Sequence, residues 1–101
     1  MLVATEFGRT VAVNGTQGTD HGTGSMAMLL GGAVRGGRVI ADWPGLAQGS
    51  LYEGRDLKPT TAIDAAIAGA LGSHFQIDPD RLLAKAFPGS GGKPLEGITK
   101  A

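Results

Sequence analysis

The stretch from Thr60 to Phe75, TTAIDAAIAGALGSHF, contains the clearest secondary-structure signal in the chain. Thr61, followed three residues later by Asp64, is typical of a helix N-terminal cap, with Asp where a capping box would have Glu. We therefore predict a helix over this stretch. Its apolar residues recur at the three- and four-residue spacing that places them on one core-facing side; they are Ile63, Ala66, Ile67, Ala70, Leu71 and Phe75.

The chain after this helix predicts a second, shorter one. Asp78 is a good capping residue, and Pro79 suits the first turn because its missing N–H is not needed there. The run Phe87-Pro88-Gly89 ends this helix, and residues 89–101 are expected to form a loop and a frayed tail. Three side chains of the helix are expected to face the core, namely Leu82, Leu83 and Ala86.

Three short apolar runs before the first helix predict strands, at residues 2–5, 26–30 and 38–42. Continuous apolar character is typical of strands covered on both faces, as in a parallel or mixed α/β sheet. Residues 8–25 are glycine-rich and predict a long loop, in which Asn14-Gly15 is a turn signal. Such a thin sheet with two helices predicts an α/β fold that is part of a larger domain.

Composition limits the classes of function. A chain of 101 residues forms one domain at most. Nine basic and nine acidic residues cancel, so the charge predicts neither a nucleic-acid partner nor an anionic membrane partner. The absence of cysteine excludes disulfides and thiolate metal sites. The first residues do not resemble a signal peptide, and no apolar run has the length of a membrane span.

The adjacent pair Asp20-His21 is the strongest candidate for a site. A carboxylate and a neutral imidazole are good ligands for a divalent cation, and the neighbouring glycines let both side chains converge. The alternative is that Asp20 caps a turn and His21 is a solvated bystander. A metal site needs a third ligand, for which Glu6, just past the first predicted strand, is the best candidate. Arg9 suits a phosphate or sulfate oxyanion, or a salt bridge to one of these carboxylates.

Six motifs in order resemble one bacterial family. They are TEFGRT (5–10), NGTQGTDHGTGS (14–25), LLGGAVRGGRV (29–39), DWPGL (42–46), RDLKPTT (55–61) and FPG (87–89). Together they resemble the C-terminal part of the "domain of unknown function 1501" family, whose members are similar to the alkaline phosphatase and sulfatase superfamily. The resemblance extends from Leu2 to about Pro88.

The resemblance implies a partial alkaline-phosphatase-like sheet with two helices, the C-terminal fragment of a larger domain. It also implies a divalent-metal centre (zinc, manganese or calcium) that hydrolyses phosphate or sulfate esters in the intact protein. Two alignments are open: Asp20-His21 is the metal pair of the superfamily, or Glu6 replaces that pair and His21 is a later histidine. We prefer the second, because Glu6 and His21 can then meet at the sheet edge.

The same resemblance implies that important parts lie elsewhere. The superfamily nucleophile and the first metal carboxylate belong to a more N-terminal region, as does the twin-arginine export signal that intact, exported members commonly carry. We therefore expect Glu6, Asp20 and His21 to form part of a metal site that is inactive alone, with the missing N-terminal part of the domain as its partner. The alternative is a non-catalytic module that packs through its glycine-rich loop or forms a homo-oligomer.

Overall fold

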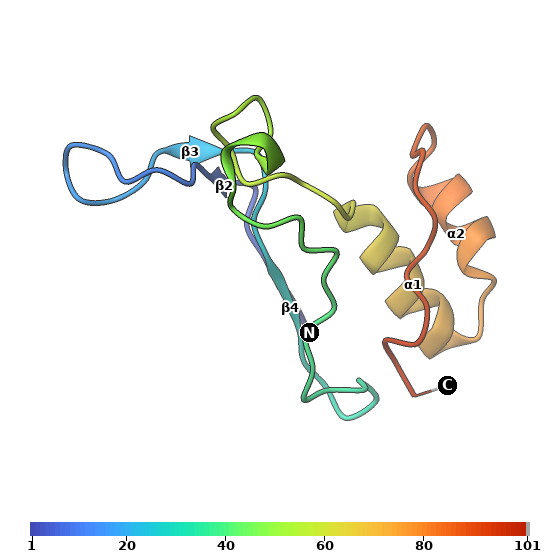
Figure 1. The fold of residues 1–101 in the computed structure, drawn as a ribbon. Coiled ribbons are helices and arrows are strands. Elements are labelled where there is room, and N and C mark those ends of the chain that lie inside the picture. The colour runs from blue at the N-terminus through green and yellow to red at the C-terminus, as the bar shows by residue number, and fades with distance from the viewer. Residues whose placement is uncertain (101) are drawn as a thin grey trace. The chain divides into compact units, whose positions relative to one another are not determined.

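The computed structural model describes residues 1–100 (Figure 1). These residues divide into two compact units. The first unit contains Met1, Leu29–Ile40 and the chain from Thr61 onward, and the second contains Leu2–Met28 and Ala41–Thr60. The elements are strands β1 (Leu2–Ala4), β2 (Gly8–Arg9), β3 (His21–Gly22) and β4 (Ala27–Leu29), a 3-10 turn η1 (Gln48–Ser50), and helices α1 (Ile63–Phe75) and α2 (Pro79–Ala86).

Helix α1 confirms the predicted helix but not its predicted cap. The residue at the N-cap position is Ala62, whose side chain has no oxygen and makes no capping hydrogen bond. Thr61 lies one residue before that position, so the prediction of a Thr61–Asp64 capping box is wrong. The helix ends at Phe75, and Gln76 follows in the left-handed conformation with its N–H donating to the Gly72 carbonyl.

The predicted core face of α1 is wrong in part: Ala66, Ile67 and Ala70 are half-buried, but none of the six predicted residues is fully buried. The buried positions are the small ones, Ala65, Ala68, Gly69 and Gly72. Three of the larger apolar side chains remain exposed, with Ile63 at 48%, Leu71 at 43% and Phe75 at 61% of their full accessibility. We call these three side chains the α1 apolar face.

The physical reason is a close backbone contact on the small-residue side of α1. The Leu95 N–H donates to the Ala65 carbonyl at 3.1 Å. A Cβ added at Gly69 would overlap the Leu95 carbonyl oxygen, and one added at Gly72 would lie 2.9 Å from the Ile77 carbonyl oxygen. A large side chain cannot fit on this side, so the alanines and glycines make the contact and the leucine and phenylalanine are left outside.

Helix α2 confirms its predicted start and end. The Asp78 carboxylate accepts from the Asp80 N–H at 3.1 Å, and Pro79 occupies the first turn. The last helical residue is Ala86, before Phe87 at the C-cap. Of the three side chains expected in the core, Leu83 is buried and Leu82 is half-buried. Ala86 is exposed, so its prediction is wrong.

The chain beyond Gly89 packs on the first unit through its last described residues. Ile98 and Thr99 are both 5% exposed, and Thr99 forms an antiparallel bridge with Val34. The Thr99 hydroxyl donates to Ser73 Oγ at 2.5 Å. The buried apolar residues among residues 1–100 all belong to this unit and are Ala65, Ala68, Leu83 and Ile98.

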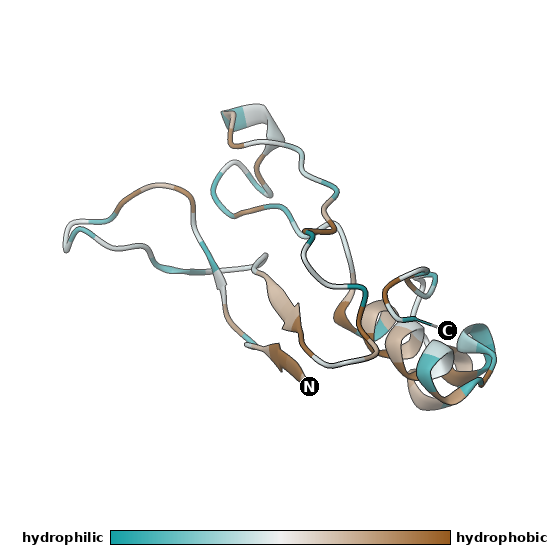
Figure 2. Cartoon of the chain, turned by 90° about the horizontal axis from the view of Figure 1, so that it is seen from below, coloured by the Kyte–Doolittle hydropathy of each residue, from teal (hydrophilic) through white to brown (hydrophobic). Residues whose placement is uncertain are grey.

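The strands form two separate two-stranded sheets, β1 with β4 and β2 with β3. The predicted mixture of strands and two helices is confirmed, but the single parallel or mixed sheet is wrong, since both pairs are antiparallel. β1 is hydrophobic along its length (Figure 2) yet exposed, so the prediction of a buried strand is also wrong. Residues 38–42 form no strand. None of the helices within residues 1–100 combines the length and apolar character needed to cross a bilayer.

The Gly69 contact can be tested by one methyl group. Alanine favours a helix over glycine by about 1 kcal/mol, but here its Cβ meets the Leu95 carbonyl, so we expect Gly69→Ala to lower the free energy of unfolding by about 1–3 kcal/mol. Urea unfolding followed by circular dichroism measures this. Gly91→Ala is the matched control, because an added Cβ there has no neighbour within 4 Å. Equal stability of the two variants would contradict the packing described for α1.

Candidate functional site

The second unit is built on a short hairpin within the segment predicted as a long loop. β2 and β3 pair antiparallel with Gly8 opposite Gly22 and Arg9 opposite His21. The glycines are required by close approach, since a Cβ added at Gly8 would lie 2.6 Å from the Gly24 nitrogen and one added at Gly22 would lie 2.6 Å from the Arg9 carbonyl oxygen. The prediction of continuous loop over residues 8–25 is therefore wrong at these four positions.

A second segment, residues 52–57, runs alongside this hairpin. The Leu57 N–H donates to the Arg9 carbonyl at 3.2 Å, and the Leu57 carbonyl accepts from the Gly24 N–H at 3.1 Å. The Val11 N–H donates to the Arg55 carbonyl at 3.1 Å, and Thr10 and Asp56 form an isolated antiparallel bridge. These backbone hydrogen bonds hold Asp56 against the hairpin.

Asp56 is the buried carboxylate of this unit, with only 2% of its surface exposed. It accepts a hydrogen bond from the Thr23 hydroxyl at 2.6 Å and another from Arg55 Nε at 2.8 Å. The Thr23 hydrogen bond, followed by that from Arg55, lowers the pKa of the Asp56 carboxyl below its ordinary value. The carboxylate is therefore ionised and fully engaged within the protein, as expected of a structural anchor.

The loop between β2 and β3 is closed by polar side chains. The Asp20 backbone N–H donates to the Thr10 hydroxyl at 3.0 Å. The Thr10 N–H donates to the Asp20 carbonyl, also at 3.0 Å. The Asp20 carboxylate accepts from Asn14 Nδ2 at 3.0 Å. Arg9 Nε donates to the Thr19 hydroxyl at 2.8 Å, and Arg9 Nη2 donates to the Thr19 carbonyl. This set of hydrogen bonds determines the path of the loop.

The predicted metal ligands are all on the surface of this unit. Glu6, Asp20 and His21 are exposed. The His21 ring stacks on Phe7, with centroids 4.7 Å apart and planes 14° from parallel. Within residues 1–100 no three His, Cys, Asp or Glu side chains lie close enough to hold a metal ion. These three residues alone therefore do not make a complete metal site.

Arg9, the predicted oxyanion contact, bonds to Thr19 within the loop. Two of its guanidinium nitrogens bond to Thr19, so the side chain ties the two ends of the loop together. The remaining nitrogen, Nη1, has no hydrogen bond within residues 1–100. A planar guanidinium can therefore hold the loop and still offer one donor outward.

Sequence reasoning missed Asp56 and its partner Thr23. Both lie in motifs on which the family resemblance rests, RDLKPTT and NGTQGTDHGTGS, but neither has a local signal of its own. They are 33 positions apart in the chain. Only the pairing of the hairpin with residues 52–57 brings the hydroxyl to the carboxylate, and no periodicity in the sequence predicts that pairing.

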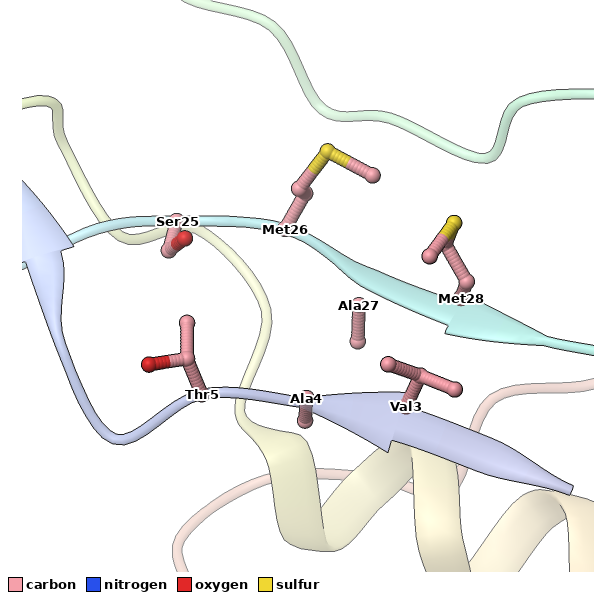
Figure 3. Close-up of a pocket in the computed structure, with 7 residues that line it drawn as sticks. All are labelled: Val3, Ala4, Thr5, Ser25, Met26, Ala27 and Met28. Atoms are coloured by element: carbon pink, nitrogen blue, oxygen red, sulfur yellow. The ribbon is translucent and has the colours of Figure 1, made fainter.

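An apolar hollow lies on the β1–β4 sheet (Figure 3). Met26 and Met28 project from the same side of the strand and Ala27 from the other, while Thr5 and Ser25 lie at one end of the hollow. The side chains that line it include no acid, base or nucleophilic thiol; they are Val3, Ala4, Thr5, Ser25, Met26, Ala27 and Met28. The lining is therefore mainly apolar, with hydroxyl groups only from Thr5 and Ser25.

A family model described as "protein of unknown function (DUF1501)" matches residues 1–87. The chain belongs to this family. The match includes the hairpin, the Asp56 anchor and both helices, and it ends before Leu95, Ile98 and Thr99, which pack on the first unit. Comparisons with curated proteins and with solved structures give no match.

The Asp56 anchor predicts a specific loss of stability in acid. A carboxyl whose pKa is lowered on folding stabilises the protein above its unfolded pKa, about 3.9, and this contribution is lost as the pH falls through the folded pKa. We expect the urea concentration at the unfolding midpoint of the parent chain to decrease once the pH is lowered below about 4. Asp56→Asn should be less stable than the parent at neutral pH, and its stability should depend less on acid pH.

The control for this experiment is Asp42→Asn, because Asp42 is exposed and makes no hydrogen bond or ion pair within residues 1–100. Thr23→Val provides a milder variant that removes one hydrogen bond and retains the carboxylate. The same acid dependence in the parent, Asp42→Asn and Asp56→Asn would show that Asp56 is not the anchor.

Proposed function

We propose that this DUF1501 chain is the C-terminal segment of an alkaline phosphatase- or sulfatase-like protein and is not catalytic alone. The observation that carries the proposal is the exposure of its apolar surface. The α1 apolar face, Met26 and Met28 are exposed, whereas only four apolar residues within residues 1–100 are buried, two of them alanines. Burial of apolar surface contributes about 25 cal/mol per Å², so further polypeptide that covered these surfaces would stabilise the chain.

The proposal includes part of a divalent-metal site at the hairpin. Its support is that Asp20 and His21 are adjacent and exposed, and that each side chain is oriented by a neighbour, Asn14 and Phe7 respectively. Glu6 is the expected third ligand. Further ligands would have to come from polypeptide outside residues 1–100, because the donors within this range do not complete a site.

A bound divalent ion would polarise an oxygen of a phosphate or sulfate ester. The residues of this chain would hold and orient the ion and the ester and would not themselves react. Asp20 is kept in place by the Asn14 amide, and the free Arg9 Nη1 is available to an oxyanion while the rest of the guanidinium holds the loop. The nucleophile belongs to the N-terminal part that the family resemblance implies.

Metal binding by the chain tests this half-site. We expect weak binding of zinc in equilibrium dialysis, with manganese and calcium as comparisons, and no hydrolysis of phosphate or sulfate monoesters. Each 1.4 kcal/mol of binding free energy corresponds to about a tenfold change in affinity. If His21 is a ligand, His21→Ala should weaken zinc binding about tenfold or more. His74→Ala is the matched control, since His74 is an exposed histidine on α1. Equal zinc affinity of His21→Ala and the parent would contradict the site.

A second candidate function is a non-catalytic, self-associating module. The observation that favours it is the α1 apolar face, whose exposed side chains form a stripe along one helix as in helix–helix interfaces. In this case a second copy of the chain, rather than a longer domain, covers the helix.

Size-exclusion chromatography distinguishes the two candidates. A self-associating module elutes as an oligomer whether or not a chelator is present, and Leu71→Gln should shift it toward the monomer because a polar amide replaces an apolar contact. Leu46→Gln is the control, since Leu46 is 53% exposed but lies outside α1. A monomeric parent chain, or an equal shift for both variants, would contradict self-association through α1.

A further inference from the structure

The dipeptide Asn14-Gly15 lies in the loop between β2 and β3, and Asn14 is the only asparagine in the chain. We propose that this dipeptide is a site of spontaneous deamidation and that the folded loop promotes the reaction. The Gly15 backbone nitrogen attacks Asn14 Cγ, and the C–N bond to Nδ2 breaks. Water then opens the cyclic imide, so that the amide and water become an acid and ammonia.

The side-chain carbonyl oxygen of Asn14, Oδ1, is surrounded by hydrogen-bond donors. Oδ1 accepts from the Thr16 N–H at 3.0 Å, the Thr16 hydroxyl at 2.8 Å and the Gly18 N–H at 3.0 Å. Attack at Cγ places negative charge on this oxygen. Donors that are already in position stabilise such an oxyanion without reorganisation, as in the oxyanion holes of acyl-transfer enzymes.

The attacking nitrogen is accessible. The Gly15 N–H makes no hydrogen bond within residues 1–100, so its proton can be lost to solvent without breaking a contact. Gly15 is exposed, and the space where a Cβ would stand has no neighbour within 4 Å. Because Gly15 has no side chain and open space beside it, the backbone rotation that brings the nitrogen to Cγ meets little steric resistance.

The leaving nitrogen is oriented by Asp20. Asn14 Nδ2 donates to the Asp20 carboxylate at 3.0 Å, which fixes the plane of the amide relative to the three donors on Oδ1. Nδ2 departs as ammonia after taking up a proton from water. Hydrolysis of either carbonyl bond of the imide then leaves an aspartate or an isoaspartate at position 14.

The product changes the loop that carries Asp20 and His21. A carboxylate replaces the amide donor, so the hydrogen bond to Asp20 is lost and two negative groups face each other. The net charge of the chain falls by one. Deamidation would therefore loosen the loop and add a carboxylate next to Asp20.

Peptide mapping by mass spectrometry, with the purified chain incubated at neutral to mildly alkaline pH, tests the proposal. We expect conversion at the Asn14 peptide and slower conversion in Thr16→Val, by roughly fivefold to tenfold, the effect of one hydrogen bond. Thr60→Val should convert at the parent rate, because Thr60 is exposed and lies outside the loop. Circular dichroism verifies that the variants are folded.

Two results would overturn the proposal. If Thr16→Val converts as fast as the parent or faster, the hydrogen bonds on Oδ1 protect the amide rather than activate it. If the folded chain converts more slowly than the same chain unfolded in urea, the loop hinders the reaction instead of promoting it.

Discussion

The second unit depends on the hydrogen bonds that the buried Asp56 carboxylate accepts. This unit has no buried large apolar side chain among its described residues, so it cannot be held together by a hydrophobic core. The Thr23 hydroxyl and the Arg55 guanidinium compensate for removing the carboxylate from water. Because these partners come from the hairpin and from residues 52–57, one ionised group joins two segments that are distant in sequence.

The first unit is organised by a different constraint, the close approach of backbone to helix α1. Gly69 and Gly72 leave space for the Leu95 and Ile77 carbonyls, and this space fixes which side of the helix is buried. A consequence is that the larger side chains of α1 are displaced to the exposed side. The apolar surface that supports the proposed larger assembly thus has the same origin as the packing of the unit itself.

The local elements of this fold could be predicted, and their partners could not. Helix α2 begins at the predicted cap because the Asp78–Asp80 hydrogen bond depends only on neighbouring residues. Strand β1 was predicted from its apolar run, but its exposure and its antiparallel partner β4 were not. The candidate site shows the same division: Asp20 and His21 were recognised as a pair, whereas Asn14 and Phe7, which orient them, were not assigned that role.

The sequence by itself determined the two helices, the end of α2, the family and the chemistry available in the glycine-rich loop. These depend on residue type and spacing over a few positions, where capping, periodicity and motif order act directly. Only the tertiary structure decided which side of α1 is buried, which strands pair and that Asp56 anchors the hairpin. Those outcomes depend on contacts between segments up to 33 positions apart, where steric fit and the need to satisfy a buried carboxylate outweigh local preference.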